Sequence, residues 1–243
     1  SSPSRGLGDV YKRQDQASMD FSKSMIAYVK DEYGVDPVYE AQAGEKETDF
    51  RSYLLKAKAT NPDALVCSGL VDETVRCLVQ SYEVGIPKSV ARVANSVASK
   101  VEVPTNAGKA AVGVSYAAAF AASDTRPIAK KFVKHIKSTY GVVPGHDFSQ
   151  MEDLLTMLKP ALEKAEKGFS GDLTSDRKAV RDAIAGITNF TGLASGPISF
   201  CAAGSPECRD GNRTPVMIEY TKGGKNWKTK VAGTVTFNAS AGL

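Results

Sequence analysis

Residues 48–85 read TDFRSYLLKAKATNPDALVCSGLVDETVRCLVQSYEVG and contain the clearest alternation of helix and strand patterns in the chain. Its first part repeats apolar side chains at the spacing of one buried helix face: Phe50, Leu54 and Ala57. Residues 64–67 then form an uninterrupted apolar run, which is typical of a strand covered on both faces. A second helical pattern follows and ends at Gly85, and one of its sides carries Val75, Leu78, Val79 and Tyr82. Helix, buried strand and helix with short connections indicate βαβ units and a parallel sheet.

The alternation continues on both sides of this stretch. Upstream, an amphipathic helix over 19–32 precedes a short strand at 38–41, and downstream we expect strands at 90–94 and 112–117. After Ala122 helical patterns dominate, at 127–140, 148–167 and 175–185. The chain closes with a short strand at 198–201 and a β-hairpin formed by 217–220 and 227–231. The sequence therefore predicts an α/β fold with a parallel sheet followed by a helical region.

The composition is that of an ordinary globular chain. The 243 residues are 42% hydrophobic and 24% charged, with a mean hydropathy of −0.23. The chain is long enough for a substantial core, and no apolar run approaches the roughly 20 residues of a membrane span. The net charge is +4, but basic and acidic residues alternate along the chain. We therefore expect neither a nucleic-acid partner nor a direct membrane span.

Residues 1–14, SSPSRGLGDVYKRQ, differ from the rest of the chain. They show neither apolar periodicity nor the apolar core of a signal peptide. They resemble translated sequencing-adaptor read-through, and the alternative is a native linker. We treat them as a non-native or disordered leader outside the fold. On this interpretation the native N-terminus is missing, together with any signal peptide.

Several short motifs carry a family resemblance. Residues 43–50 read AGEKETDF, residues 54–58 read LLKAK, and residues 61–65 read NPDAL. In this order they resemble the second lobe of type I periplasmic solute-binding proteins, in particular the leucine/isoleucine/valine-binding family of ABC importers. Residues 124–140, 149–166 and 178–200 resemble later helices of that family. The resemblance covers about residues 15–235.

The resemblance implies a domain organisation and a function. Residues 15–118 correspond to the second ligand-binding lobe, which contains the complete parallel sheet. Residues 119–200 correspond to the crossover and to helices of a partial first lobe, and residues 201–243 to a C-terminal hairpin and tail. Without the sheet that they normally cover, these helices are expected to expose an apolar face. The implied protein lies in the periplasm, binds a small-molecule ligand by hinge closure and docks on ABC permease subunits.

The residues offer little for catalysis. His135 and His146 are the only histidines, and neither has a cysteine or carboxylate at metal-ligand spacing. Residues 113–117, GVSYA, break off before completing a serine nucleophile elbow. We expect a binding protein rather than an enzyme, with no metal and no cofactor.

Two pairs of cysteines allow disulfides. Cys201 and Cys208 flank a short loop containing glycine and proline, so a disulfide there is expected, with two free thiols as the alternative. Such a bridge indicates an oxidising compartment. Cys67 and Cys77 lie on a strand and the next helix, where both suit buried free thiols. Whether this second pair is bridged stays open at the level of sequence.

Ligands of α/β proteins bind at the carboxyl edge of the sheet. There we expect ligand-binding residues in two loops, the first carrying Leu70, Val71 and Asp72 and the second carrying Asn95 and Ser96. In the amino-acid-binding family, the first loop carries an aromatic residue, the second an acidic residue that pairs with the ligand ammonium, and the hinge a tyrosine. This chain has Leu70 and Val71 in the place of the aromatic residue and Asn95 in the place of the acidic residue. Ser18 stands near the place of the hinge tyrosine. These three departures weigh against a strict amino-acid specificity, so the expected ligand extends from an amino acid to an amide or a similar small solute.

Other candidates have two interpretations each. Asp72 either supplies the missing charge or caps a helix that starts near Glu73. Tyr116 and Phe120 either stack on the ligand or pack in the core. His146 and Phe148 approach the cleft if the family topology holds. The alternative function is a ligand-sensing regulator or receptor domain of the same fold.

Overall fold

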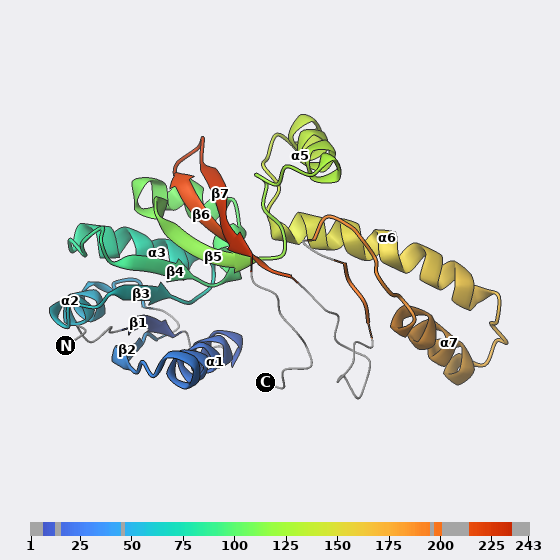
Figure 1. The fold of residues 1–243 in the computed structure, drawn as a ribbon, viewed down its shortest axis with the longest axis horizontal. Helices are drawn as coiled ribbons and strands as arrows, with labels where there is room; N and C mark the ends of the chain where they lie inside the picture. The colour runs from blue at the N-terminus through green and yellow to red at the C-terminus, as the bar shows by residue number, and fades with distance from the viewer. Residues whose placement is uncertain (1–6, 13–15, 45–46, 195–196, 201–213, 235–243) are drawn as a thin grey trace. The chain divides into compact units, whose positions relative to one another are not determined.

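The computed structural model describes residues 7–12, 16–44, 47–194, 197–200 and 214–234 (Figure 1). The chain forms two compact units. The first consists of residues 1–117 and 218–230, and the second of residues 118–217 and 231–243.

The first unit is built on a sheet with the strand order β2-β1-β3-β4-β5-β6-β7. Each neighbouring pair among the first five of these strands is parallel, as the sequence predicts. The sheet ends in the hairpin of β6 and β7, which are joined across Gly223 and Gly224 (Figure 1). The seven strands are β1 (Leu7–Lys12), β2 (Pro37–Gln42), β3 (Ala64–Cys67), β4 (Ala91–Ala94), β5 (Val114–Ala118), β6 (Val216–Lys222) and β7 (Lys228–Thr234).

Strand β1 corrects one expectation. Residues 1–14 were predicted to lie outside the fold, but Leu7–Lys12 forms a strand between β2 and β3, with Gly8 opposite both Tyr39 and Leu65. The segment has little apolar alternation, so pairing on both sides decides its conformation rather than local propensity. The sequence did contain one signal for this strand. The predicted βαβ array begins with a helix, and a strand normally precedes such a helix.

The helices of the first unit follow the strands along the chain. They are α1 (Gln16–Tyr33), α2 (Arg51–Ala59), α3 (Val71–Glu83) and α4 (Glu102–Ala107), with short 3₁₀ turns at η1 (Ser96–Ser99) and η2 (Gly108–Ala111). The predicted inner stripe around α2 is confirmed, because Phe50, Leu54 and Ala57 are fully buried.

Helix α3 buries a more polar face than predicted. Tyr82, expected inside, is 37% exposed, whereas Thr74 and Ser81 are fully buried beside Cys77 and Leu78. The buried polar groups are satisfied internally, since the Thr74 hydroxyl donates to the Gly69 carbonyl and the Ser81 hydroxyl to that of Leu78. Short polar side chains with local partners can therefore occupy the face that the apolar pattern assigned to larger residues.

The second unit contains α5 (Pro127–Tyr140), α6 (His146–Glu166) and α7 (Leu173–Ala185). The buried Asp153 of α6 accepts hydrogen bonds from the backbone N–H groups of Leu193 and Ala194, each at 2.7 Å. The expected strand at 198–201 is reduced to a bridge between Ile198 and Phe190 in the part that the structure describes.

One face of α6 is apolar and open to solvent. Phe148, Met151, Leu155 and Leu162 recur at three-, four- and seven-residue intervals and are 43–62% exposed. Exposed apolar side chains were expected in this helical region, and α6 carries them.

Candidate functional site

The strand order fixes where a ligand site belongs in the first unit. In the order β2-β1-β3-β4-β5 the chain reverses its direction of growth between β1 and β3, which makes this the topological switch point. Parallel α/β sheets bind ligands outside the carboxyl ends of the strands at such a point. Strand β3 ends at Cys67, so the loop of residues 68–70 lies at its carboxyl end. Asn95 lies at the carboxyl end of the neighbouring β4.

Hydrogen bonds tie these two loops together. The Asn95 side-chain N–H donates to the Gly69 carbonyl at 3.0 Å, and the Thr74 hydroxyl donates to the same oxygen at 3.3 Å. The Thr74 backbone N–H donates to the Leu70 carbonyl at 2.9 Å and closes the first turn of α3. The structure therefore brings together the five residues predicted in the loops, Leu70, Val71, Asp72, Asn95 and Ser96.

Two polar oxygens at this edge have unused hydrogen-bonding capacity. The Ser68 hydroxyl and the Asn95 side-chain carbonyl are buried and have no partner among the described residues. A buried polar group without a partner costs about 1–3 kcal/mol, so such groups are informative. From the sequence, Ser68 begins the first loop but is not among the predicted ligand-binding residues. The signal that could have added it is a hydroxyl directly after a buried strand.

The start of α3 carries negative charge. The helix begins at Val71 after Leu70, and no side chain caps it, so the interpretation of Asp72 as the cap is wrong. Asp72 lies instead in the first turn and is exposed, next to Glu73 in the same turn. Two carboxylates interact favourably with the helix dipole and make this end less receptive to an anion. The loop is better suited to a ligand that donates hydrogen bonds or carries a positive group.

A disulfide braces the first loop. Cys67 at the end of β3 and Cys77 in α3 are bonded, with Cα atoms 6.0 Å apart, and both are fully buried. The bridge encloses residues 68–76, which include the candidate ligand-binding loop. This settles the pairing that the sequence left open, while Cys201 and Cys208 lie outside the described residues.

Tyr116 and Phe120 occupy packed positions in different units. Tyr116 is 3% exposed, and its ring centre lies 5.2 Å from that of Tyr220. Burial raises the pKa of Tyr116 to about 12. Phe120 is 1% exposed and meets Phe132 edge to face at 5.8 Å. These surroundings agree with the packing interpretation of both residues.

His146 and Phe148 begin helix α6 of the second unit. The His146 side chain is 13% exposed, with Nε2 lying 2.8 Å from an Asp147 carboxylate oxygen, and Phe148 belongs to the exposed apolar face of α6. Within the described residues, no group of three or more histidine, cysteine or acidic side chains is arranged to hold a metal ion. No helix in that part of the chain is long and apolar enough to cross a membrane.

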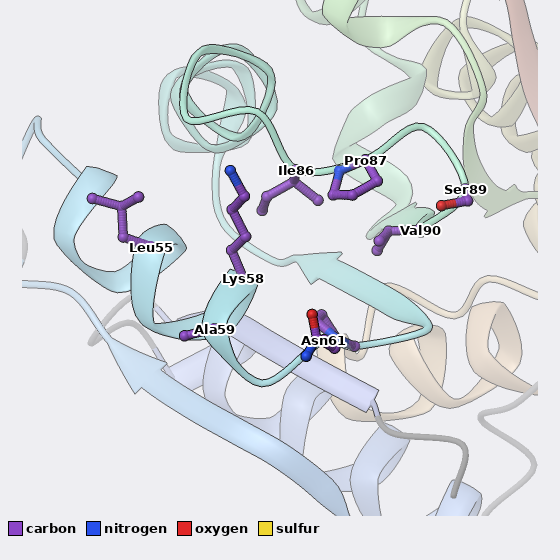
Figure 2. A pocket seen from close by; sticks show the side chains of 9 residues that line it. Leu55, Lys58, Ala59, Asn61, Ile86, Pro87, Ser89 and Val90 are labelled. Atoms are coloured by element: carbon purple, nitrogen blue, oxygen red, sulfur yellow. The ribbon is translucent and has the colours of Figure 1, made fainter. Parts of the chain in front are cut away.

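A cavity of about 530 Å³ lies at the opposite edge of the same sheet, where β3 begins (Figure 2). Figure 2 shows Lys58 and Ile86 among its lining residues, and none of the residues predicted to bind ligand lines it. The Lys58 ammonium already donates to the Val84 carbonyl at 2.8 Å. This cavity is therefore separate from the switch-point site.

The fold is that of a periplasmic binding protein of type I. The family model of the periplasmic binding proteins matches residues 10–209, and the chain belongs to this family. The family consists of solute-binding proteins. No curated protein sequence matches the chain significantly.

Solved structures share the fold at low sequence identity. A leucine-binding protein from Thermotoga maritima has 23% identity and a TM-score of 0.76, over 95% of this chain and 60% of its own. A branched-chain amino acid transporter substrate-binding protein from Streptococcus pneumoniae, in complex with isoleucine, has 22% identity and a TM-score of 0.74, over 95% and 60%. An ABC transporter solute-binding protein from Rhodopseudomonas palustris, in complex with 3,4-dihydroxybenzoic acid, has 19% identity and a TM-score of 0.73, over 96% and 61%. The chain thus spans about 60% of the length of these proteins.

Proposed function

We propose that this chain belongs to the solute-binding component of an ABC importer and binds a small solute at the carboxyl edge of its parallel sheet. The observation that carries the proposal is the hydrogen-bonded pair of loops at the carboxyl ends of β3 and β4, next to the topological switch point. Asn95 ties the second loop to Gly69 of the first, and both Asn95 and Ser68 retain oxygens without a partner among the described residues. A ligand that hydrogen-bonds these loops satisfies groups that are otherwise unpaired.

The charges at the site favour a ligand with hydrogen-bond donors. Asp72 is exposed in the first turn of α3, and Asn95 offers a neutral carbonyl oxygen. An ammonium or amide N–H group is the natural complement of these acceptors. The proposed ligand is therefore an amino acid, an amide or a similar small solute, and the solutes bound by the similar structures include isoleucine.

The proposed mechanism is closure of a hinge around the ligand, with no bond made or broken. Permease subunits of the importer are the proposed partners, and the periplasm is the proposed location. The Cys67–Cys77 disulfide supports this location, since structural disulfides persist mainly in oxidising compartments.

A thermal-shift screen tests the proposal. The protein is expressed from its complete gene and heated with amino acids, short amides, urea-like solutes and aromatic acids. A ligand that binds only the folded state raises the thermal midpoint. At a ligand concentration 100 times its dissociation constant, the free energy of unfolding increases by about 2.7 kcal/mol. We expect one class of solutes with N–H donors to raise the midpoint. A folded, monodisperse sample that responds to no solute contradicts the proposal.

A further inference from the structure

A second cavity in the first unit has a strongly basic lining. It has a volume of about 500 Å³ and lies where β4 and β5 begin, the edge of the sheet opposite the proposed solute site. Three of its lining residues are cationic, namely Lys88, Arg92 and Lys109, and none is acidic. The lining also includes the ring of Tyr82 and apolar side chains.

Arg92 is the unusual member of this lining. It is 7% exposed, yet no carboxylate pairs with it in the part of the chain that the structure describes. Its guanidinium donates through one nitrogen to the carbonyls of Ile86 and Pro87, at 2.9 and 3.4 Å. Burial lowers the pKa of Arg92, since it disfavours the charged form. A buried cation is costly unless an anion or several acceptors compensate it, and among the described residues two carbonyls do so.

The other two cations extend this charge toward solvent. The Lys109 ammonium lies 4.7 Å from the centre of the Tyr82 ring, a cation–π contact that fixes its position at the cavity. Lys88 is exposed at the same cavity. One buried and two exposed cationic residues therefore line a shared space, together with the apolar Val90 and Val112.

We propose that this cavity binds a small organic anion, with a carboxylate or phosphate group held by Arg92, Lys88 and Lys109 and an apolar body against Val90 and Val112. Arginine presents a planar set of donors that matches both kinds of oxyanion, and lysine adds point charges. The volume lies within the usual range of about 300–1,000 Å³ for small-molecule sites and exceeds the size of a bare inorganic ion. The site does not depend on the proposed solute function, because it lies at the other edge of the sheet.

Calorimetric titration with phenyl phosphate, benzoate and inorganic phosphate, at constant ionic strength, tests this inference. We expect saturable 1:1 binding of at least one of the two organic anions, and affinity at least tenfold lower in the double variant Lys88→Gln/Lys109→Gln. The control is Lys56→Gln/Lys130→Gln, which removes the same charge at two exposed lysines outside the lining and is expected to bind like wild type.

Each other outcome overturns the proposal. Equal weakening in both double variants indicates general charge attraction, and equal binding by inorganic phosphate and the organic anions removes the role of the apolar walls. Absence of binding by either organic anion to folded wild-type protein rejects the site. The variant Arg92→Lys adds a second check, because it keeps the charge but loses the planar donor set. This variant is expected to bind the organic anion more weakly than wild type. Its thermal midpoint shows whether the variant is still folded.

Discussion

The Cys67–Cys77 disulfide is expected to contribute substantially to the stability of the first unit. The two cysteines are ten residues apart in sequence, and closing a loop of this length in the unfolded chain corresponds to about 2.7 kcal/mol at 25 °C. For a chain of this size that loss lowers the thermal midpoint by roughly 5–11 °C. The perturbation is the double variant Cys67→Ala/Cys77→Ala.

The assay is denaturant unfolding followed by tryptophan fluorescence. Trp227 is the only tryptophan, and it packs edge to face on Tyr220 in the first unit, so its signal reports on the unit that holds the disulfide. Reduction of a Cys201→Ala/Cys208→Ala background is a matched control, because it opens the same bridge without removing either sulfur atom. The two samples are expected to lose similar stability, with any excess in the alanine variant due to lost packing. A loss below about 1 kcal/mol in both refutes the loop-entropy reasoning.

Three further predictions concern packing and titration. Asp153→Ala leaves two buried backbone N–H groups without their acceptor and is expected to cost roughly 3 kcal/mol in thermal unfolding followed by circular dichroism, with a smaller loss for Asp153→Asn. Gly223→Ala places a Cβ against the backbone carbonyl of Gly108 and is expected to lower the free energy of unfolding by about 1–3 kcal/mol. The control Gly233→Ala meets nothing within 4 Å and is expected to be nearly neutral, so equal losses in the two variants contradict the prediction. The folded-state pKa of Tyr116 is about 12, above the usual 10.0, so its neutral form stabilises the fold below pH 10 and this contribution is lost as the pH rises toward 12. Between pH 9 and pH 12, the free energy of unfolding is expected to fall less in Tyr116→Phe than in wild type. Equal decreases in both proteins contradict the raised pKa of Tyr116.

The sequence predicts elements best where local chemistry marks both ends. Helix α5 begins at Pro127 and ends at Tyr140 as predicted, because proline suits a first helical turn and Gly141 adopts the left-handed conformation that stops the helix. Strand β1 could not be predicted from its own residues, because pairing with β2 and β3 determines it. The bond between Cys67 and Cys77 depends on how α3 is rotated against β3, which the apolar pattern misjudged because it placed Tyr82 inside.

For the candidate site, the sequence predicts which loops share the carboxyl edge of the sheet but not the contacts within them. The carboxyl edge of a parallel sheet follows from strand order, so the loops at Leu70 and Asn95 could be anticipated. The hydrogen bond from Asn95 to Gly69 and the unpaired hydroxyl of Ser68 depend on side-chain orientation, which spacing in the sequence does not specify. The helix start at Val71 was also missed, since no side chain of the usual capping type marks it.

We propose that the two loops at the carboxyl ends of β3 and β4 bind a small solute. Calorimetric titration of the protein from its complete gene, with the solute identified by the thermal-shift screen, tests it most directly in wild type and in Asp72→Asn/Asn95→Ala. Ser89→Ala, at the cavity on the opposite edge of the sheet, is the control. We expect one solute bound per chain, affinity at least tenfold weaker in the loop variant and unchanged affinity in the control. Equal affinity in wild type and a correctly folded loop variant contradicts it.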